Sequence, residues 1–504
     1  MAFVQNVPFF SIMISMFSGI ISSVLPGKVA RFLNAAMITL VGVMSAWLLG
    51  WFLVTDAGNY TFMMGHFPAP WGNEIRAGVL EAGMALFFCV IMLLSMLGGR
   101  KKLFDEVEIT KHNIYYILTN LLLSSLLALV YTNDLFTAYV FVEINTISAC
   151  GLIMIRQNGR TIEAAVRYMI MSLLGSGLLL MGICMLYDLT GHLLMSNIKE
   201  AVVVAMQNES SRVPMLITIG IMTVGLAIKS ALFPFHAWLP DAYGYSTVSS
   251  AAMLSSLVSK GYIFLLIKLF YRVIGFDLIA GSHILNVLFV FGLCGMIFGS
   301  VSAIWEKDIR RMIAFSSVAQ IGYIYMGFGL GTEEGMIASV FHILAHAATK
   351  SLLFISAIGL TDVTAGSRSI VDLKGAGYRN KVAGVGFAVG SLSMVGIPMF
   401  SGFISKLLFA QSAALHPTLK MFPTLIILAI STILNTIYFL KTVIRIYTPE
   451  KKKVAEEKGF FRVTWKKQKV YTVTIILFII VNLVLGMTSD PIIEMIQTGL
   501  RNFA

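Results

Sequence analysis

The amino-acid sequence predicts an all-α protein that crosses a membrane many times. Of its 504 residues, 57% are hydrophobic and only 12% are charged, about half the charged share of a typical soluble chain. The mean hydropathy is +0.84. The hydrophobic residues form long runs, and a helix needs about 20 apolar residues to span a bilayer, so the chain has room for roughly a dozen spans or more.

Fourteen apolar segments follow one another, and we interpret each as a membrane-spanning helix, numbered 1 to 14. The first is followed by Gly27, Lys28 and Arg31 instead of a small-residue cleavage site, so we expect it to be retained. The longest polar insertion, 448–469, is charged enough to lie on the cytoplasmic surface as a link. The segments lie at about 8–25, 32–54, 77–97, 113–131, 135–155, 163–187, 213–233, 247–271, 284–304, 312–330, 335–360, 382–413, 422–447 and 470–487.

The basic residues are distributed unevenly between the connections. Most of the 37 lysines and arginines fall in connections that follow odd-numbered helices, and few fall in those that follow even-numbered helices. Connections rich in Lys and Arg stay in the cytoplasm. We therefore expect a protein of the cell membrane with both termini outside the cytoplasm. The net charge of +12 then reflects topology, and no nucleic-acid partner is predicted.

Motifs for cofactor or metal chemistry are absent from the sequence. The four cysteines (Cys89, Cys150, Cys184 and Cys294) are far apart, lie in apolar segments and form no CxxC pair, so we expect core residues instead of disulfides or metal ligands. No glycine-rich phosphate loop, nucleophile elbow or iron–sulfur pattern occurs. We expect no catalytic residue, no cofactor and no resident metal in this chain.

Two lysines deep inside apolar stretches lead the functional argument. Lys229 lies near the end of helix 7, shortly before Pro234, and Lys260 lies within helix 8. A lysine in hydrocarbon costs roughly 3 kcal/mol on insertion scales, so its presence indicates a function. A proline-interrupted helix is tolerated at membrane depth only where protein or water receives the freed backbone groups. These features predict a path for charge, although Lys260 could instead bind backbone carbonyls at the break.

Glu143 lies within helix 5, among apolar neighbours. One interpretation is a structural carboxylate that is hydrogen-bonded to a neighbouring helix. The other pairs Glu143 with Lys229, because a buried carboxylate and a buried ammonium lower each other's cost. Separating such a pair shifts both pKa values by units, which is enough to load or eject a proton.

Helix 11 carries His342, His346 and Lys350 at four-residue intervals. This spacing places them on one helical face, with steps of about 6 Å along the axis. Histidines titrate near neutrality and suit proton transfer. Metal binding is a weaker alternative, since HxxxH lacks a nearby Glu or Cys, and core histidines satisfied by neighbours are common. Lys350 continues the line and favours a proton relay.

A second interruption occurs in helix 12, where Gly396 and Pro398 precede Lys406. Apolar residues flank Lys406 on both sides, which argues against a snorkelling lysine. Interrupted segments at corresponding positions of two halves indicate an internal repeat with an ion path at mid-membrane.

Several residues at the ends of helices have less certain roles. His236 lies by the break in helix 7, where it could be structural or the point where protons enter. Lys268, close to Arg272, is expected to snorkel to the outer interface. Asp134 and Asp241 are equally consistent with helix caps and with relay members.

The chain resembles the antiporter-like proton-pumping subunits shared by respiratory complex I, Mrp-type Na+/H+ antiporters and membrane-bound energy-converting hydrogenases. The resemblance implies that Glu143, Lys229, Lys260, the His342/His346/Lys350 series and Lys406 form a proton path. It departs after HAWLPDA, where the family usually continues with a His or small polar residue and an Ala-Pro-rich turn and this chain has YGYSTVSSAAM. The matching strings are DLFTAYVFVEINTISACGLI, EAAVRYMIMSLLGSG, IKSALFPFHAWLPDA, LVSKGYIFLLIK, WEKDIRRMIAFSSVAQIGYI, FHILAHAATKSLLF and SLSMVGIPMFSGFISKLL.

The resemblance also implies two inverted five-helix repeats, and together with the apolar segments and the charged insertion these divide the chain into five parts. These parts are helices 1–3 (1–112), helices 4–8 (113–272), helices 9–13 (283–447), the charged cytoplasmic link (448–469) and the last helix with the C-terminus (470–504). No lateral C-terminal helix of the kind found in the longest complex I subunit is expected.

We therefore expect a proton-translocating membrane subunit of a redox-driven complex, such as a membrane-bound hydrogenase or a complex I-like quinone oxidoreductase. The alternative is a subunit of an Mrp-type antiporter driven by ion gradients alone. The expected partners are other membrane subunits, including further antiporter-like ones, and the lipid bilayer. Exchange of Na+ for H+ stays open, and the candidate oxygen ligands for Na+ are Glu143, Asn145, Thr146 and Ser148. A stand-alone solute transporter is disfavoured by the line of charged residues.

Overall fold

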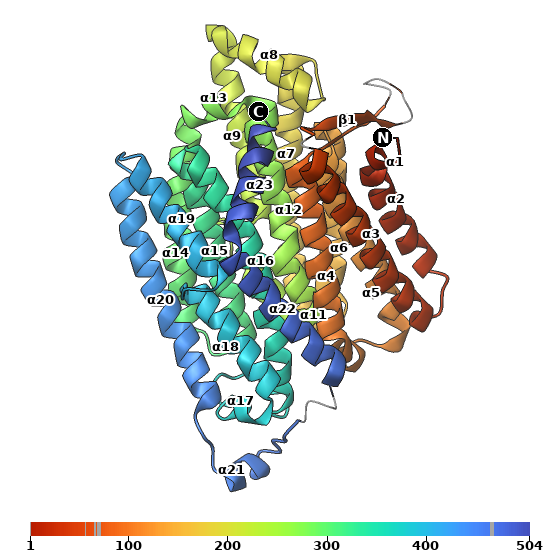
Figure 1. Ribbon diagram of the computed structural model, residues 1–504, viewed down its shortest axis with the longest axis vertical. Coiled ribbons are helices and arrows are strands. Elements are labelled where there is room, and N and C mark those ends of the chain that lie inside the picture. Colours follow the sequence, from red (N-terminus) through yellow and green to blue (C-terminus); the bar gives the residue numbers. More distant parts are fainter. Residues whose placement is uncertain (1, 56, 65–66, 68–71, 464–467, 504) are drawn as a thin grey trace.

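Long helices packed side by side make up almost all of the computed structural model (Figure 1). The structure describes residues 2–503 apart from 56, 65–66, 68–71 and 464–467. Within these residues, 12 helices are long and apolar enough to cross a membrane. The predicted all-α, multi-pass architecture is therefore confirmed. Two shorter apolar helices, α2 (Val7–Ser22) and α18 (Lys381–Val395), lie where helices 1 and 12 are predicted. The total of fourteen spans, the inverted repeats and the five-part division stay predictions.

The first part of the chain combines three long helices with a small sheet that the sequence did not predict. The strands β1 (Tyr60–Met63) and β2 (Glu74–Ala77) pair antiparallel, with Tyr60 opposite Ala77. Each strand has only four residues, so neither carries a period-two pattern long enough to recognise. The helices here are α1 (Ala2–Gln5), α2, α3 (Gly27–Thr55) and α4 (Val79–Glu106).

Helices 5 to 8 of the prediction begin at polar caps. The side chain of Asp134 accepts a hydrogen bond from the Thr137 backbone N–H, which caps α6 and supports the cap interpretation of Asp134. Asn158 and Thr161 form a reciprocal capping box at the start of α7. The elements are η2 (Ile109–Lys111), α5 (His112–Tyr131), α6 (Leu135–Met154), α7 (Gly159–Thr190), α8 (Met195–Gln207), α9 (Glu209–Lys229), α10 (Leu239–Tyr245), α11 (Val248–Met253), η3 (Leu254–Val258), α12 (Ser259–Lys268) and η4 (Leu269–Ile274).

The remaining elements repeat this pattern of long helices joined by short connections. Asp308, Thr332 and Asn380 cap α15, α16 and α18 with side-chain oxygens. The elements are α13 (Phe276–Ala280), α14 (His283–Trp305), α15 (Ile309–Leu330), α16 (Glu333–Asp362), α17 (Ala376–Arg379), α18, α19 (Ser401–Leu415), α20 (Met421–Tyr447), α21 (Lys452–Glu457), α22 (Lys469–Met487) and α23 (Ser489–Arg501).

The two predicted helix breaks are present. Helix 7 stops at Lys229 and resumes as α10 at Leu239, after a turn that contains Pro234. Helix 12 stops at Val395, where Gly396 takes a left-handed conformation with φ of +90°, and it resumes as α19 at Ser401. Helix 8 runs from Val248 to Ile274 without a gap but contains two π-helical turns, η3 and η4.

Helices 8 and 11 form the centre of the bundle. Every residue from 248 to 274 is buried, and α16 is buried along nearly its whole length. A membrane helix that other helices surround on all sides needs no lipid-facing surface, so it can carry polar residues. Lys260, His342, His346 and Lys350 all lie on these two helices.

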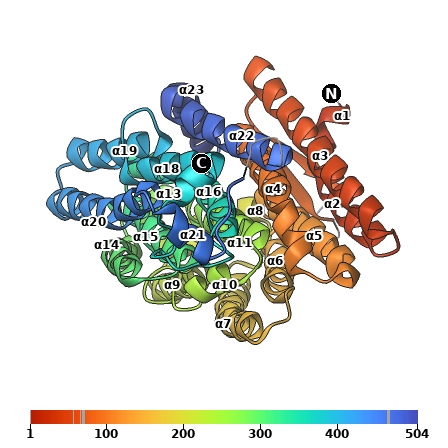
Figure 2. The same cartoon turned by 90° about the horizontal axis from the view of Figure 1, so that it is seen from below.

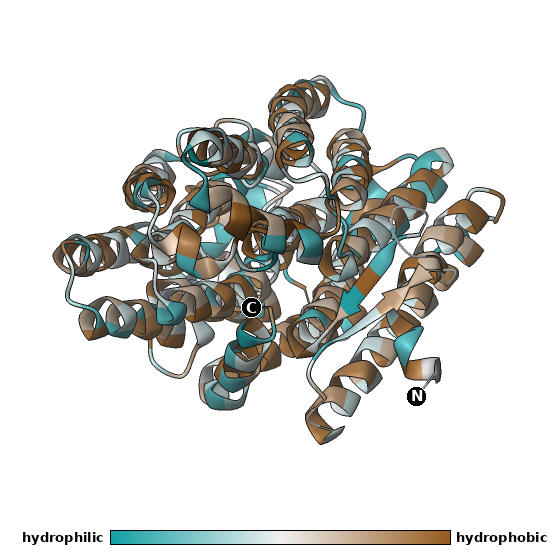
Figure 3. Ribbon diagram, turned by 90° about the horizontal axis from the view of Figure 1, so that it is seen from above, coloured by the Kyte–Doolittle hydropathy of each residue, from teal (hydrophilic) through white to brown (hydrophobic). Residues whose placement is uncertain are grey.

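Both termini lie at one end of the bundle, together with α8 and the β-hairpin, whereas α17 and α21 lie at the other end (Figures 1 and 2). Termini at the same end require an even number of crossings, a condition that twelve crossings meet as well as the predicted fourteen. Viewed from the end that carries the termini, the helices are largely hydrophobic, and hydrophilic segments lie in one strand of the hairpin, in several connections and at helix ends (Figure 3). We refer to the opposite end, with α17 and α21, as the far end.

Candidate functional site: a line of buried lysines and histidines

Lys229 and Glu143 face each other at the break in helix 7. The Lys229 Nζ lies 3.9 Å from Glu143 Oε1, and the Lys229 side chain is completely buried whereas that of Glu143 is 24% exposed. At this distance the two groups form a loose ion pair rather than a direct hydrogen bond, for which N and O come within about 3.2 Å. Glu143 Oε1 has no hydrogen-bond partner among the described atoms. The predicted pairing of Glu143 with Lys229 is therefore present in the structure.

Neutral oxygens supply the closer partners of Lys229. Its Nζ donates to Thr146 Oγ1 at 2.7 Å and to Ser172 Oγ at 3.2 Å. Two glycines make this possible, since a Cβ on Gly175 would meet the Gly225 carbonyl oxygen at 2.7 Å. The backbones of α7 and α9 therefore approach closely, which brings Ser172 to the lysine. 

Tyr262 joins this cluster to helix 8. The Lys229 Nζ lies 5.1 Å from the centre of the Tyr262 ring. The Tyr262 hydroxyl donates to Asn145 Oδ1 at 3.0 Å and lies 3.3 Å from Thr146 Oγ1. Tyr262 is two residues from Lys260 on the same helix, a spacing that points the two side chains to different faces of that helix. The sequence search did not select Tyr262, because a tyrosine in an apolar run carries no signal of its own.

Lys260 is fully buried and has no carboxylate partner among the described residues. Its Nζ donates to the Ser255 carbonyl oxygen at 2.6 Å and to Ser259 Oγ at 3.1 Å. Ser255 lies in the π-helical turn η3, directly before α12. The hydrogen bonds of Lys260 therefore match the alternative prediction, in which this lysine binds a backbone carbonyl, although the carbonyl belongs to its own helix.

The predicted line on helix 11 faces the interior. The rings of His342 and His346 are roughly parallel, with centres 6.1 Å apart, and both residues are buried. His342 Nδ1 is hydrogen-bonded to Ser405, and its ring stacks on Tyr323 with centres 5.4 Å apart. Both ring nitrogens of His346 are buried without a hydrogen-bond partner among the described atoms.

Lys350 and Lys406 lie beyond the two ends of the histidine pair. The Lys350 Nζ donates to the Ile313 carbonyl oxygen at 3.0 Å and to Ser316. The Lys406 Nζ donates to the Val395 carbonyl oxygen at 2.7 Å, on the last residue before the break in helix 12, and to Thr432 at 3.1 Å. Lys406 therefore binds the broken end of its own span instead of snorkelling to the interface.

Tyr323 and the residue next to Lys406 connect Lys406 to the histidines. The Lys406 Nζ lies 5.8 Å from the centre of the Tyr323 ring, the ring that stacks on His342. Ser405, which is hydrogen-bonded to His342, precedes Lys406 in the chain. On the other side, the hydroxyls of Ser256 in η3 and Ser351 in α16 lie 2.7 Å apart, so helix 8 contacts helix 11 directly beside Lys350. 

Two expectations are not supported by direct contacts. His236 lies in the turn after the break, where its ring stacks on Phe233 at 5.4 Å, and its Nδ1 is buried without a partner among the described atoms. No contact links His236 to the lysine line within the described residues. For Na+, the Ser148 hydroxyl is turned to the Ile144 carbonyl oxygen instead of towards Glu143.

The expectation that Lys268 snorkels is wrong. Lys268 is fully buried, and its Nζ donates to the carbonyl oxygens of Leu129, Val130 and Thr132 at the end of α5, at 3.1 Å for the first two. A lysine at this place satisfies carbonyls that α5 leaves without N–H partners. One helical turn further on, Arg272 forms a buried ion pair with Glu81 of α4. 

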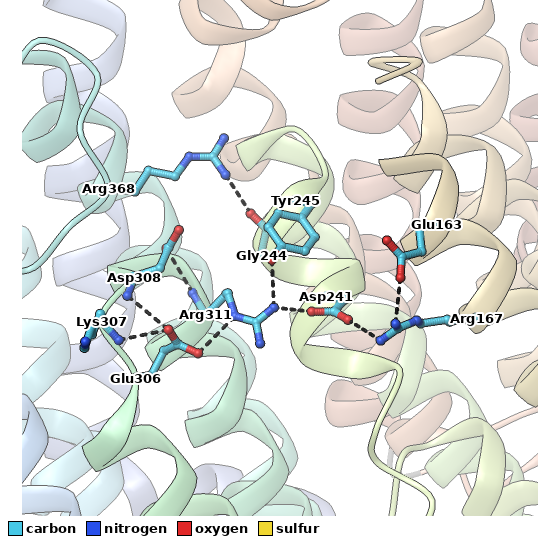
Figure 4. Close-up of polar contacts among 10 residues, drawn as sticks. All are labelled: Glu163, Arg167, Asp241, Gly244, Tyr245, Glu306, Lys307, Asp308, Arg311 and Arg368. Carbon is cyan, nitrogen blue, oxygen red and sulfur yellow. Dashed lines mark hydrogen bonds and ion pairs between the residues drawn. The ribbon is translucent and has the colours of Figure 1, made fainter. Parts of the chain in front are cut away.

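Asp241 lies on α10, and arginines from the two predicted repeats bind it (Figure 4). Its Oδ2 accepts from Arg167 of α7 at 2.9 Å, and its Oδ1 pairs with Arg311 of α15. Arg311 Nε also donates to Glu306 Oε2 at 2.9 Å. Burial alone would raise the pKa of the Glu306 carboxyl, but the hydrogen bonds from Arg311 and from the Asp308 and Lys307 backbone lower it below its usual value. Asp241 is thus a bridge between helices, not a helix cap.

The comparisons with known proteins show the family to which the chain belongs. Residues 132–434, which contain every lysine and histidine of the line, match the family described as NADH:quinone oxidoreductase/Mrp antiporter, transmembrane. The chain belongs to this family. The match extends from the start of α6 into α20 and so covers well over half of the chain.

Similar proteins come from both branches that the family description names. NADH-quinone oxidoreductase subunit N of Desulforudis audaxviator is 32% identical over 391 residues, 77% of this chain and 75% of that protein. A putative antiporter subunit, mnhA2, of Staphylococcus haemolyticus is 32% identical over 403 residues, 75% of this chain but only 49% of that protein. The chain thus spans about half the length of the antiporter relative.

Two solved structures share the fold over the full length of the chain. A chain of the Mrp complex from Dietzia sp. DQ12-45-1b superposes with a TM-score of 0.87 at 22% identity, covering 100% of this chain and 98% of that chain. A chain of the membrane-bound sulfane sulfur reductase, an archaeal respiratory membrane complex, gives a TM-score of 0.85 at 24% identity, with 100% and 97% covered. The chain is therefore an antiporter-like membrane subunit by family and by fold.

Proposed function

We propose that this family member translocates protons as one subunit of a redox-driven membrane complex, without redox chemistry of its own. The observation that carries the proposal is the Lys229–Glu143 pair, a buried ammonium held 3.9 Å from a partly exposed carboxylate at a helix break. The relatives named as a quinone oxidoreductase subunit and as part of a respiratory membrane complex support the redox context. The partners would be other membrane subunits, including further antiporter-like ones.

The proposed path joins the buried lysines and histidines described above in one order. Protons enter from the cytoplasm near the break in helix 7, with His236 as the candidate point of entrance, and load Lys229. They pass from Lys229 to Lys260, from there to the His342/His346/Lys350 line, and leave by Lys406. Both termini lie outside the cytoplasm in this arrangement, so the far end faces the cytoplasm.

Glu143 controls the first step of this path. While the carboxylate is near, it favours the charged form of Lys229, and when it moves away the proton is released. The neutral acceptors Thr146 and Ser172 hold the lysine in place in either state. Moving one charge against 100 mV costs about 2.3 kcal/mol, so each cycle needs only a modest coupled free energy. 

The decisive experiment measures ion pumping by the purified whole complex in sealed vesicles, with pH-sensitive and Na+-sensitive dyes. The variants are Glu143→Gln and Lys229→Met, which remove the charges at nearly constant volume. The control is Glu209→Gln, because that carboxylate is exposed at the start of α9, the helix that ends at Lys229, and has no ion pair among the described residues. Lys229→Met removes a group that would carry the proton and Glu143→Gln removes the charge that favours its loading, so we expect both variants to reduce reductant-driven pumping by roughly tenfold or more, which corresponds to about 1.4 kcal/mol. Normal pumping by both variants would show that the buried charges are structural.

The second candidate function is that of an Mrp-type antiporter subunit, favoured by the antiporter relative and by the Mrp complex structure. The same vesicles distinguish it from the first. If an imposed Na+ gradient moves protons and a reductant does not, the antiporter function holds and the redox proposal fails. If the reductant alone drives proton uptake, the antiporter alternative fails.

A further inference from the structure

A basic pocket opens at the far end of the bundle, away from the lysine line. It lies between the last turns of α4, the end of α16 and the start of α22, and its volume is about 480 Å³. Pockets that bind small ligands usually measure about 300–1,000 Å³. Its charged lining residues are Arg100, Lys101, Lys102, Lys469 and Asp362.

The positive charge of this pocket is mostly unneutralised. Lys102 pairs with Asp362, with 2.9 Å between Nζ and Oδ1. Arg100, Lys101 and Lys469 have no carboxylate within ion-pair distance among the described residues. Three cations on two helices therefore surround a space that contains a single, already paired acid. Like charges held together in this way repel unless an anion lies between them.

The rest of the lining is apolar, and it continues onto the surface that would face lipid. Leu97 and Ile358 line the pocket on α4 and α16, and Val470 and Tyr471 line it on α22. Val470 is 45% exposed, on the outer face of a membrane-spanning helix. A cationic rim above an apolar wall at the end of three spans matches the two ends of a phospholipid, with phosphate at the rim and acyl chain along the helices.

We propose that this pocket binds the phosphate group of an anionic phospholipid. Basic pockets between membrane helices on the cytoplasmic side bind anionic headgroups, and the far end is the one that the distribution of charged residues assigns to the cytoplasm. A lipid bound here would join α4 and α22 to the end of α16, where the Lys102–Asp362 pair already connects two of these helices.

The experiment uses the complex that contains the full chain, purified in detergent and stripped of lipid. The variant combines Arg100→Gln, Lys101→Gln and Lys469→Gln. The control combines Arg160→Gln, Lys381→Gln and Lys453→Gln, which removes three exposed charges from the far end but none from the pocket. The probes are phosphatidylglycerol, phosphatidylcholine and inorganic phosphate. Native mass spectrometry counts bound lipid, and the unfolding temperature reports stabilisation.

We expect phosphatidylglycerol, but neither other probe, to raise the unfolding temperature of the wild type and the control by a few degrees and to be retained. The pocket variant should unfold normally without lipid but lose both effects. Equal effects in the pocket variant and the wild type would overturn the proposal. So would equal effects of phosphatidylcholine, while full stabilisation by inorganic phosphate would indicate a site for free anions. None of these readouts depends on ion transport, so the proposal stands or falls separately from the function proposed above.

Discussion

The buried lysines of the line are held mainly by neutral oxygens. Only Lys229 has a carboxylate within 4 Å among the described residues, and even there the closest contact is the Thr146 hydroxyl. Lys260 and Lys406 each donate to a backbone carbonyl. A neutral acceptor holds a lysine in place but stabilises its charge much less than a carboxylate would. A lysine held by neutral oxygens can lose its proton without leaving an unpaired carboxylate buried beside it.

A substitution at Thr146 tests this arrangement. Thr146→Val keeps the shape of the side chain but removes the oxygen that lies 2.7 Å from Lys229. We expect pumping to fall several-fold and the unfolding temperature to fall by a few degrees, since a hydrogen bond to a charged group contributes roughly 1.5–3 kcal/mol. Reductant-driven uptake in vesicles gives the rate.

The matched control is Thr223→Val, six residues before Lys229 on α9. The Thr223 hydroxyl is buried without a partner among the described atoms, so its removal should change neither the rate nor the stability. Equal rates for Thr146→Val and the wild type would mean that the neutral acceptors do not matter to transport.

The sequence allowed a functional residue to be predicted where the signal was its position inside a single apolar helix. Lys229, Lys260 and the His342 series stand out because charge inside an apolar run is expensive. The role of Lys268 was not predictable, because its acceptors lie at the end of α5, more than 130 residues earlier in the chain. The ion pair between Arg272 and Glu81, one helical turn further on, joins helix 8 to α4. The sequence does not reveal that these two helices are adjacent.

At the scale of elements, the two broken helices place their lysines differently. Lys229 ends the half-helix before its break, whereas Lys406 lies on the half-helix after its break and reaches back to Val395. Gly396 makes this return possible, because its missing side chain leaves room beside the lysine. A Cβ at Gly396 would lie 3.0 Å from Lys406 Cδ.

Gly396→Ala should therefore impair both stability and transport. A left-handed conformation costs an L-residue roughly 1–2 kcal/mol, and the added methyl also displaces Lys406. Gly191→Ala provides the control, because Gly191 also has a positive φ, of +73°, but nothing lies within 4 Å of its Cβ position. Both variants should unfold at lower temperature, and only Gly396→Ala should slow pumping. A similar loss of pumping in both would attribute the effect to strain alone.

The elements that the sequence predicted are those with long apolar runs. The breaks in helices 7 and 12 were also predicted, because proline and glycine interrupt the runs there. The β-hairpin and α23 were not. Each strand of the hairpin is too short for a pattern, and α23 is amphipathic and packs on α4, a contact that only the folded bundle provides. The π-helical turns in helix 8 also lack a sequence signal.

At the scale of the whole molecule, the network around Asp241 connects the two predicted repeats. Arg167 belongs to the first and Arg311 to the second, and both bind the same carboxylate on the helix that follows the break (Figure 4). Glu306 holds Arg311 from the other side. A movement of one half therefore changes the charges that face the other.

The lowered pKa of Glu306 predicts how this network responds to acid. A carboxyl whose pKa falls on folding stabilises the fold above its ordinary value of 4.5, and this contribution disappears as the pH falls through the lowered value. Glu306→Gln should therefore lower the unfolding temperature at neutral pH, and the difference from the wild type should vanish in strong acid.

Unfolding temperatures recorded between pH 3 and pH 8 test this expectation, a range set around the usual carboxyl pKa of about 4. Glu457→Gln is the control, because Glu457 is exposed and has no ion pair among the described residues. A Glu306→Gln difference that stays constant down to the lowest pH would mean that the Glu306 charge does not stabilise the network.

The scarcity of carboxylates along the line limits how many charges it can hold at once. Glu143 is the only acid within ion-pair distance of Lys229, Lys260, Lys350 or Lys406 among the described residues. Two unit charges 10 Å apart repel by about 1.7 kcal/mol at an effective dielectric constant of 20, so each ammonium makes the next one harder to form. In the proposed path, a charged lysine therefore requires a neutral lysine next to it. The movement of this unprotonated site backwards along the line describes the same transport as the movement of protons forwards.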